Sequence, residues 1–301
     1  MIGRISVVGA GLMGHGIALT FARAGHDVVV QDPDEASLAS LHDRIKDSLA
    51  GLGVAASDPI LARVSTASQL KDAVADADLV IEAAPEKPAL KQAIFAEIEA
   101  AAPDHAIMAS NTSVIPITTI MGGLENKHRA LGTHWWNPPH MIPLVEVIRT
   151  QWTDEASMDA VVEVLTLAGK TPARVEKDVA GFIGNRLQHA LWREAISLVE
   201  NGICDAETVD DVVKASFGRR LAVLGPLENA DLVGTDLTQD IHAQVLQDLE
   251  SSGAPSPYLD KLVADGRLGM KTGEGFRQWQ HGDMEKTKSR IATHLAKLDE
   301  T

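Results

Sequence analysis

A glycine-rich segment near the start of the chain has the spacing of a phosphate-binding site. It runs from Gly9 to Gly14 as Gly-Ala-Gly-Leu-Met-Gly, the pattern G-x-G-x-x-G, between an apolar run and a helix-like stretch. In this pattern Gly9 permits a tight turn, Gly11 lets the backbone approach a pyrophosphate, and Gly14 allows a helix to pack closely on a strand. The free N–H groups of the following helix attract the anion. We therefore predict that this segment, Leu12 and Met13 included, binds a dinucleotide.

An acidic residue at the expected distance indicates which dinucleotide binds. Asp32 ends a predicted strand 23 residues after Gly9, where a carboxylate can accept hydrogen bonds from the adenosine ribose hydroxyls. Asp34 and Glu35 follow it, and no arginine is nearby in the sequence. Carboxylates would repel a 2′-phosphate, so we predict NAD rather than NADP. The alternative is that Asp32 merely caps the next helix.

A histidine and a glutamate could together move a proton. An imidazole titrates near neutrality and suits a general base, and a carboxylate behind it fixes its tautomer and stabilises its charged form. His134 follows a strand-like run, and Glu146 lies in another between apolar neighbours, where a carboxylate needs a partner. We expect adjacent strands to bring them together across the loop 137–143. Helical periodicity turns Asn185 about 200° away from Ile183, so that it could face a cleft between domains.

These residues also have ordinary structural explanations. A histidine beside two tryptophans is more often packed or capping than catalytic. Ser113 could serve a turn or a cap, and Asn185 could be an exposed helix residue. No His, Cys, Asp and Glu side chains have the spacing of metal ligands, so we predict no metal.

The elements that must position these residues alternate between strand and helix. The first strand, helix and strand form a βαβ unit, which implies parallel pairing. The alternation favours the α/β class, a Rossmann-type doubly wound parallel sheet. Strands are predicted at 5–8, 28–30, 79–81, 106–109, 131–133 and 144–148, and helices at 17–24, 35–49 and 90–101.

Near residue 180 the pattern becomes helical throughout. Helices are predicted at 183–198, 206–215, 227–249 and 257–264. We therefore predict a dinucleotide-binding domain at 1–179 and an all-helical domain at 180–301. The segment 280–301 carries an amphipathic pattern whose role the sequence leaves open.

Composition limits the functions and partners to be considered. The 301 residues include 42 acidic and 27 basic side chains, for a net charge of −15. Such a surface repels phosphate backbones and anionic lipid, so we expect neither nucleic acid nor a membrane as a partner. No apolar run reaches the roughly 20 residues of a membrane span, and the chain enters a strand too early for a signal peptide. The single cysteine, Cys204, cannot form an internal disulfide, which favours the cytoplasm.

The order and spacing of several segments resemble the L-3-hydroxyacyl-CoA dehydrogenase family over about residues 2–279. The resemblance implies an NAD-dependent oxidation of a CH–OH group in which His134 is the general base and Glu146 orients it. It implies that Ser113 and Asn185 contact the reacting oxygen, and that the helical domain forms a homodimer. The segments are Ser110–Ser113, Gly132–Pro138, Leu144–Ile148, Asp178–Arg186 and Lys271–Phe276.

Two departures from the family pattern bear on the substrate. Acyl-CoA members have a longer, lysine-rich insertion that reaches toward CoA, whereas residues 33–70 here hold three basic and five acidic side chains, a net charge of −2. The family's His-Phe-Phe-Asn-Pro is His134-Trp-Trp-Asn-Pro138 in this chain. The chain looks more like the branch of L-gulonate 3-dehydrogenase, lambda-crystallin and the pyridine-carboxylate 5-dehydrogenase. Arg219 or Arg220 could clamp a substrate carboxylate, or both could form surface ion pairs.

Four functions therefore stay open at this point. We favour an NAD-dependent dehydrogenase that oxidises the secondary alcohol of a small hydroxy carboxylic acid, an L-3-hydroxy acid by resemblance. The second is an L-3-hydroxyacyl-CoA dehydrogenase acting on a CoA thioester. The third is a non-enzymatic, crystallin-like NAD-binding protein. The fourth is the 3-hydroxyisobutyrate and 6-phosphogluconate dehydrogenase group, which uses a catalytic lysine where this chain offers His134.

Overall fold

The computed structural model describes residues 2–54 and 57–298, and these fall into two compact units. One unit runs to Arg186 and takes in the segment from Ile291 onward, and the other is Leu187–Arg290. The ends of the two predicted domains, Met1 and 299–301, lie outside the described residues.

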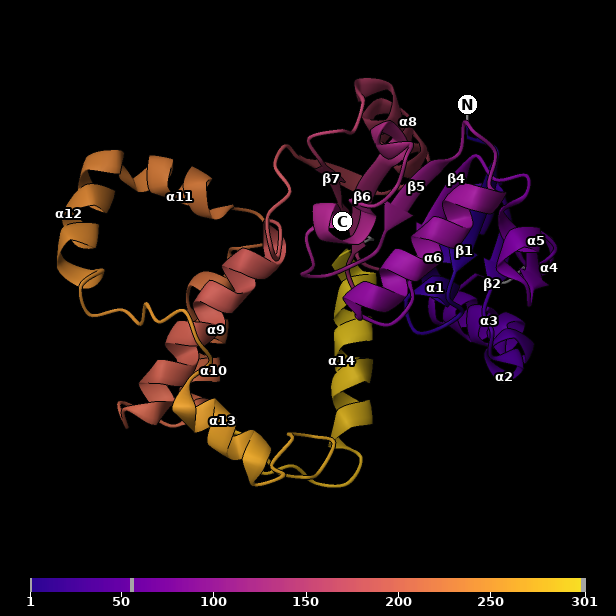
Figure 1. Ribbon diagram of the computed structural model, residues 1–301. Helices are drawn as coiled ribbons and strands as arrows, with labels where there is room; N and C mark the ends of the chain where they lie inside the picture. The colour runs from indigo at the N-terminus through magenta and orange to yellow at the C-terminus, as the bar shows by residue number, and fades with distance from the viewer. Residues whose placement is uncertain (1, 55–56, 299–301) are drawn as a thin grey trace. The chain divides into compact units, whose positions relative to one another are not determined.

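An eight-stranded sheet forms the centre of the first unit (Figure 1). Its strand order is β3-β2-β1-β4-β5-β6-β7-β8. The order reverses direction between β1 and β4, which is the place where open α/β sheets bind ligands at the carboxyl ends of their strands. The strands are β1 (Arg4–Val8), β2 (Asp27–Gln31), β3 (Val64–Ala67), β4 (Leu79–Glu82), β5 (Ile107–Ser110), β6 (Ala130–Trp135), β7 (Leu144–Arg149) and β8 (Thr171–Val175).

Helices cover both faces of this sheet, because successive strand side chains point to opposite sides. In β4, Leu79 and Ile81 belong to one buried cluster and Val80 to the other. The first cluster includes α1 (Gly14–Arg23), α3 (Leu41–Gly51) and α8 (Glu155–Leu167). The second includes α5 (Leu70–Val74), α6 (Pro88–Ala101) and α7 (Ile117–Met121). The predicted doubly wound α/β class is therefore confirmed. Shorter helices are α2 (Glu35–Ala39), α4 (Asp58–Leu61) and η1 (Lys127–Arg129).

The sheet differs from the fully parallel prediction at one pairing. Strand β7 runs antiparallel to β6, whereas the other pairings among the described strands are parallel. The connection between them, 136–143, is shorter than the dozen or so residues that a parallel crossover requires. Strands β3 and β8 escaped prediction because each has a single fully buried residue, Val64 or Val175, and so lacks an apolar run. The helix predicted at 35–49 is divided at Ser40.

The second unit is helical, and it has almost no core of its own. Of its described residues only Leu262 and Gly275 are buried. The helix predicted at 227–249 is two helices, divided at Gly234, whose φ of +100° is a conformation that favours glycine. No helix in the described part of the chain is both long and apolar enough to cross a membrane. The helices that lie wholly or partly in this unit are α9 (Gly184–Glu200), α10 (Ala206–Ala215), η2 (Phe217–Arg219), α11 (Pro226–Val233), α12 (Thr235–Val245), α13 (Pro257–Ala264) and α14 (Asp283–Leu298).

Candidate active site

The glycine segment joins β1 to α1 at the carboxyl edge of the sheet, and its three glycines are needed for different reasons. A Cβ on Gly9, whose φ is +108°, would lie 2.8 Å from the carbonyl oxygen of Ala83, and one on Gly14 would lie 1.7 Å from that of Gly9. A Cβ on Gly11 would meet nothing within 4 Å. Packing of the chain therefore requires the first and third glycines, while the second borders open space. This arrangement fits a pyrophosphate approaching the backbone at Gly11.

Asp32 stands beside this loop, at the end of β2. Its Oδ2 accepts a hydrogen bond from the Ala10 amide at 2.7 Å and its Oδ1 one from the Asp34 amide at 2.9 Å. The half-buried carboxylate is thus held in place, and its oxygens can still accept from ribose hydroxyls.

One residue near the loop was missed at the sequence level. The Arg44 guanidinium, from α3, donates to the carbonyl oxygen of Gly11 at 3.3 Å and to that of Ser37 at 2.8 Å. An arginine is therefore near the predicted pyrophosphate position, although none is near Asp32 in the sequence. Of the remaining predicted loop residues, Leu12 is exposed and Met13 is half-buried.

His134 and Glu146 lie opposite each other on β6 and β7. The imidazole Nδ1 is 2.6 Å from Glu146 Oε2, and the residues are 3% and 1% exposed. With Nδ1 donating to the carboxylate, Nε2 keeps its lone pair and can accept a proton. The other carboxylate oxygen, Oε1, accepts hydrogen bonds from the amides of Ile183 and Gly184 at 2.8 and 3.0 Å.

Hydrogen bonding keeps this buried carboxylate charged. Burial alone would raise the pKa of Glu146, but hydrogen bonds from His134, Gly184 and Ile183 bring that pKa below its ordinary value of 4.5. The carboxylate therefore remains ionised at neutral pH, where it can stabilise an imidazolium formed on His134.

Ser113 and Asn185 are also brought together, from the segment after β5 and the first turn of α9. The Asn185 amide donates to the backbone oxygen of Ser113 at 2.8 Å, and Asn185 is 8% exposed. The Ser113 side chain is exposed, and its hydroxyl has no hydrogen-bond partner among the described residues. Because Asn185 follows Gly184, whose amide binds Glu146, continuous contacts link all four predicted residues.

A glutamate that sequence reasoning missed holds the backbone at Ser113. Glu86 Oε1 accepts hydrogen bonds from the Thr112 hydroxyl at 2.5 Å and from the amides of Ser113 and Val114 at 2.9 and 3.3 Å. Its Oε2 lies 3.4 Å from Lys91 Nζ, and that ammonium is 2.7 Å from Glu82 Oε1, in a pair with no exposed side-chain surface. Glu82, the one charged residue of the otherwise apolar strand β4, is a sequence signal that could have pointed to buried polar contacts here.

The two arginines predicted to clamp a carboxylate belong to the helical unit. Arg219 ends η2 and Arg220 follows it. Both are exposed, and neither side chain forms an ion pair or hydrogen bond with the part of the chain that is described. The surface ion pairs that were the alternative for these two arginines are therefore not formed within the described part of the chain.

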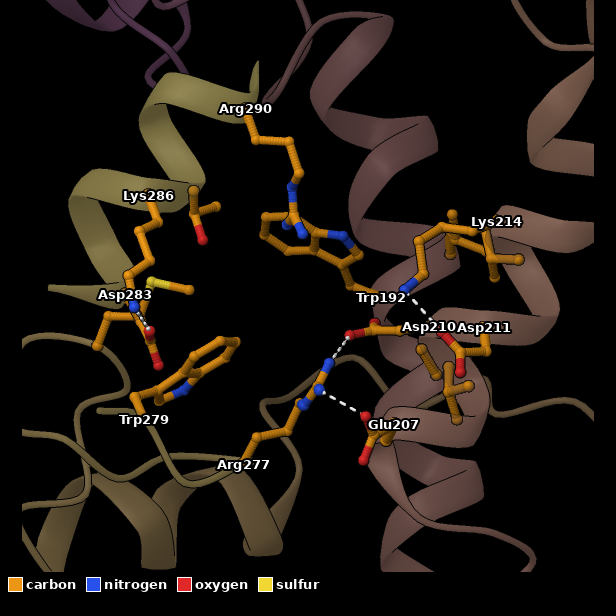
Figure 2. A pocket seen from close by; sticks show the side chains of 16 residues that line it. Trp192, Glu207, Asp210, Asp211, Lys214, Arg277, Trp279, Asp283, Lys286 and Arg290 are labelled. Atoms are coloured by element: carbon orange, nitrogen blue, oxygen red, sulfur yellow. Dashed lines mark hydrogen bonds and ion pairs between the residues drawn. The ribbon is translucent and has the colours of Figure 1, made fainter. Parts of the chain in front are cut away.

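A cavity of about 810 Å³ lies within the helical unit (Figure 2), and no predicted site residue lines it. Arg277 projects into it, with its guanidinium 3.0 Å from carboxylate oxygens of both Glu207 and Asp210 and over the ring of Trp279. These charges are already paired, and none of the residues that line the cavity is a histidine. Among the described residues, no three His, Cys, Asp or Glu side chains are grouped to hold a metal ion.

Comparison with known proteins gives matches along nearly the whole chain. The model of the 3-hydroxyacyl-CoA dehydrogenase NAD-binding domain matches residues 4–179, and that of the C-terminal domain of the same enzymes matches 181–279. The chain is 34% identical to 5-formyl-3-hydroxy-2-methylpyridine 4-carboxylate 5-dehydrogenase of Mesorhizobium japonicum, over 99% of this chain and 96% of that protein. It is 39% identical to 3-hydroxybutyryl-CoA dehydrogenase of Mycobacterium tuberculosis, over 91% of this chain and 98% of that protein.

Solved structures similar to this chain are also dehydrogenases. A crystal structure of a dehydrogenase for the same pyridine carboxylate, described as an NAD+-dependent dismutase, has a TM-score of 0.93 at 32% identity and covers 99% of this chain and 98% of its own. The (S)-3-hydroxybutyryl-CoA dehydrogenase of Ralstonia eutropha has a TM-score of 0.78 at 31% identity and covers 93% of this chain and 100% of its own.

Proposed function

This chain belongs to the 3-hydroxyacyl-CoA dehydrogenase family, and we propose that within it the chain oxidises the secondary alcohol of a small, free L-3-hydroxy carboxylic acid. It is an NAD-dependent oxidoreductase acting on CH–OH donors.

The contact between His134 and Glu146 carries the assignment of roles. His134 Nε2 takes the hydroxyl proton, and the ionised Glu146 stabilises the imidazolium that results. The free Ser113 hydroxyl and the Asn185 amide hold the substrate oxygen, since Glu86 anchors the segment of Ser113, Glu146 anchors the start of α9, and Asn185 contacts Ser113. When bound, NAD accepts the hydride from the carbinol carbon.

The loop and Asp32 would hold the cofactor. The open space at Gly11 and the N–H groups at the start of α1 suit the pyrophosphate, and Arg44 adds a positive charge beside it. The Asp32 carboxylate suits the adenosine ribose. Because Gly11 has no side chain and borders open space, the pyrophosphate can approach its backbone directly.

Charge favours a free acid over a CoA thioester. The segment 33–70 has a net charge of −2, whereas CoA carries three phosphate groups that call for clustered cations. The Mesorhizobium relative, named for a pyridine carboxylate, matches 99% of this chain. Arg219 or Arg220, both exposed and unpaired within the described residues, would bind the substrate carboxylate.

The helical domain that we propose for 180–301, to which the unit Leu187–Arg290 belongs, would form a homodimer. Leu227 is 81% exposed, Leu232 73% and Val223 82%, and so many open apolar side chains are typical of a surface that another subunit covers. A second copy would supply the core that this unit lacks. The dimer would work in the cytoplasm, for which the single Cys204 remains the supporting observation.

An activity screen with NAD tests the substrate proposal. Free L-3-hydroxy acids should give NADH, and 3-hydroxybutyryl-CoA should give little; CoA should compete weakly. Efficient oxidation of the thioester, with salt-sensitive inhibition by CoA, would overturn the free-acid proposal in favour of the acyl-CoA alternative. No NADH from either class would favour the non-enzymatic alternative. Sedimentation velocity tests the dimer: a monomer at micromolar concentration would contradict it.

A further inference from the structure

A large apolar residue next to the catalytic pair has an unusual backbone. Phe182 has a φ of +47°, and it is the one non-glycine residue with positive φ in the described chain. It follows Gly181, whose φ is +74°. The left-handed region is unfavourable for an ordinary side chain, and a bulky residue there is an outlier. Such strain persists where the surrounding contacts impose it, commonly at functional sites.

The backbone that follows Phe182 donates hydrogen bonds to the Glu146 carboxylate. The two residues that follow Phe182 are Ile183 and Gly184, whose amides both donate to Glu146 Oε1. One residue before it, the Gly181 amide donates to the Val114 oxygen at 3.3 Å, next to Ser113. The left-handed residues Gly181 and Phe182 therefore turn the chain. The Gly181 amide before the turn donates to Val114, and the two amides after it donate to Glu146.

The ring of Phe182 packs against the His134 imidazole. Its centroid lies 5.7 Å from that of His134, with the two planes at 49°, and Phe182 is 1% exposed. The ring belongs to the buried cluster that contains Ile117 and Ile148. It thus lies between the apolar core and the base, with Trp136 as a second ring 5.2 Å from His134. This enclosure limits the access of water to the hydrogen bond between Nδ1 and Oε2.

We propose that Phe182 is a positioning residue for the dehydrogenase reaction. Its backbone directs two amides at Glu146 and its ring holds the His134 imidazole in the orientation that Glu146 selects. It acts through these two residues and takes no part in proton or hydride transfer. The inference rests on the proposed function for its kinetic consequence, while its structural consequence can be measured without any substrate.

The test compares Phe182→Leu with Phe95→Leu. Phe95, in α6, is 0% exposed and belongs to the same buried cluster, so the second substitution removes a matched ring away from the site. For Phe182→Leu we expect kcat to fall about 10- to 100-fold with an unchanged KM for NAD, because the base is displaced rather than the cofactor. For Phe95→Leu we expect lower thermal stability and an unchanged kcat.

Proton NMR supplies a readout that is independent of turnover. The short hydrogen bond between His134 and Glu146 should give a low-field proton resonance in the wild type and in Phe95→Leu, and it should broaden by exchange with water in Phe182→Leu. A sharp resonance and unchanged kcat in a folded Phe182→Leu protein would overturn the proposal. If Phe182→Leu does not fold, Phe182→Met, of similar volume, replaces it with the same expectations. An inactive wild type that shows the resonance would count against the proposed function alone.

Discussion

His134 and Glu146 face each other across the antiparallel pair of strands in an otherwise parallel sheet, with Nδ1 2.6 Å from Oε2. The relationship follows from the short connection at 136–143, which makes β6 and β7 a hairpin-like pair. In such a pair a shift of one residue would turn either side chain to the other face of the sheet. The strand register therefore determines which carboxylate meets the base.

Glu146→Gln tests the charge of that carboxylate with its shape preserved. An amide can neither stabilise the imidazolium nor enforce the tautomer that leaves Nε2 free, so kcat should fall by about 10²–10⁴-fold. The dissociation constant for NAD, measured by protein fluorescence, should hardly change. Turnover equal to that of the wild type would show that Glu146 has no part in orienting the base.

Gly11→Ala and Gly14→Ala separate cofactor binding from folding. A methyl group at Gly11 has open space around it, so this variant should keep the wild-type melting temperature while its KM for NAD rises at least tenfold, because the methyl meets the pyrophosphate. A methyl at Gly14 would collide with the Gly9 carbonyl oxygen, so that variant should lose stability. An unchanged KM for Gly11→Ala would place the cofactor elsewhere.

His140, in the loop between β6 and β7, should make stability depend on pH. Burial, followed by the charges of His15, Lys170 and Arg23, lowers the pKa of His140 to about 4. In the unfolded chain it returns to about 6.5, so between pH 6.5 and 4 the unfolded chain takes up a proton that the native state does not. Stability that is present above pH 6.5 is therefore lost as the pH falls.

The loss attributable to His140 is on the order of 1–3 kcal/mol after allowance for its partial exposure. Denaturant unfolding of the wild type and His140→Gln at pH 8 and pH 4.5 measures it. The variant should lose less stability between those two pH values than the wild type does. Parallel losses in the two proteins would rule out a contribution from His140.

The central strands and the cofactor loop could be predicted from the sequence because their signals are local. Strands β1, β2 and β4 are short apolar runs bounded by turns, and the glycine segment lies between the first of them and a helix. The family resemblance rested on several such segments together, and it is confirmed. The direction of β7 could also have been inferred, since the connection before it is too short for a crossover.

Other features depend on contacts between distant segments and left little local signal. Glu86 binds backbone amides at Ser113 and Val114, which any residue except proline could supply. Phe182 lies in the segment Asp178–Arg186 that carried the family resemblance, but its left-handed backbone follows from its partners rather than from its type. Helical periodicity predicts a common apolar face for Ile183 and Leu187, and both are exposed among the described residues, because burial depends on contacts with other segments and not on periodicity.

His134→Ala is the most direct test of the account, measured as kcat on whichever hydroxy acid the wild type oxidises best. We predict a fall of about 10²–10⁴-fold with NAD binding retained, because only the acceptor of the alcohol proton is removed. His105→Ala, at an exposed histidine paired with Asp78 just before β5, is the control and should keep wild-type turnover. Full turnover in the His134→Ala protein would contradict the account, since the proton would then leave by another group.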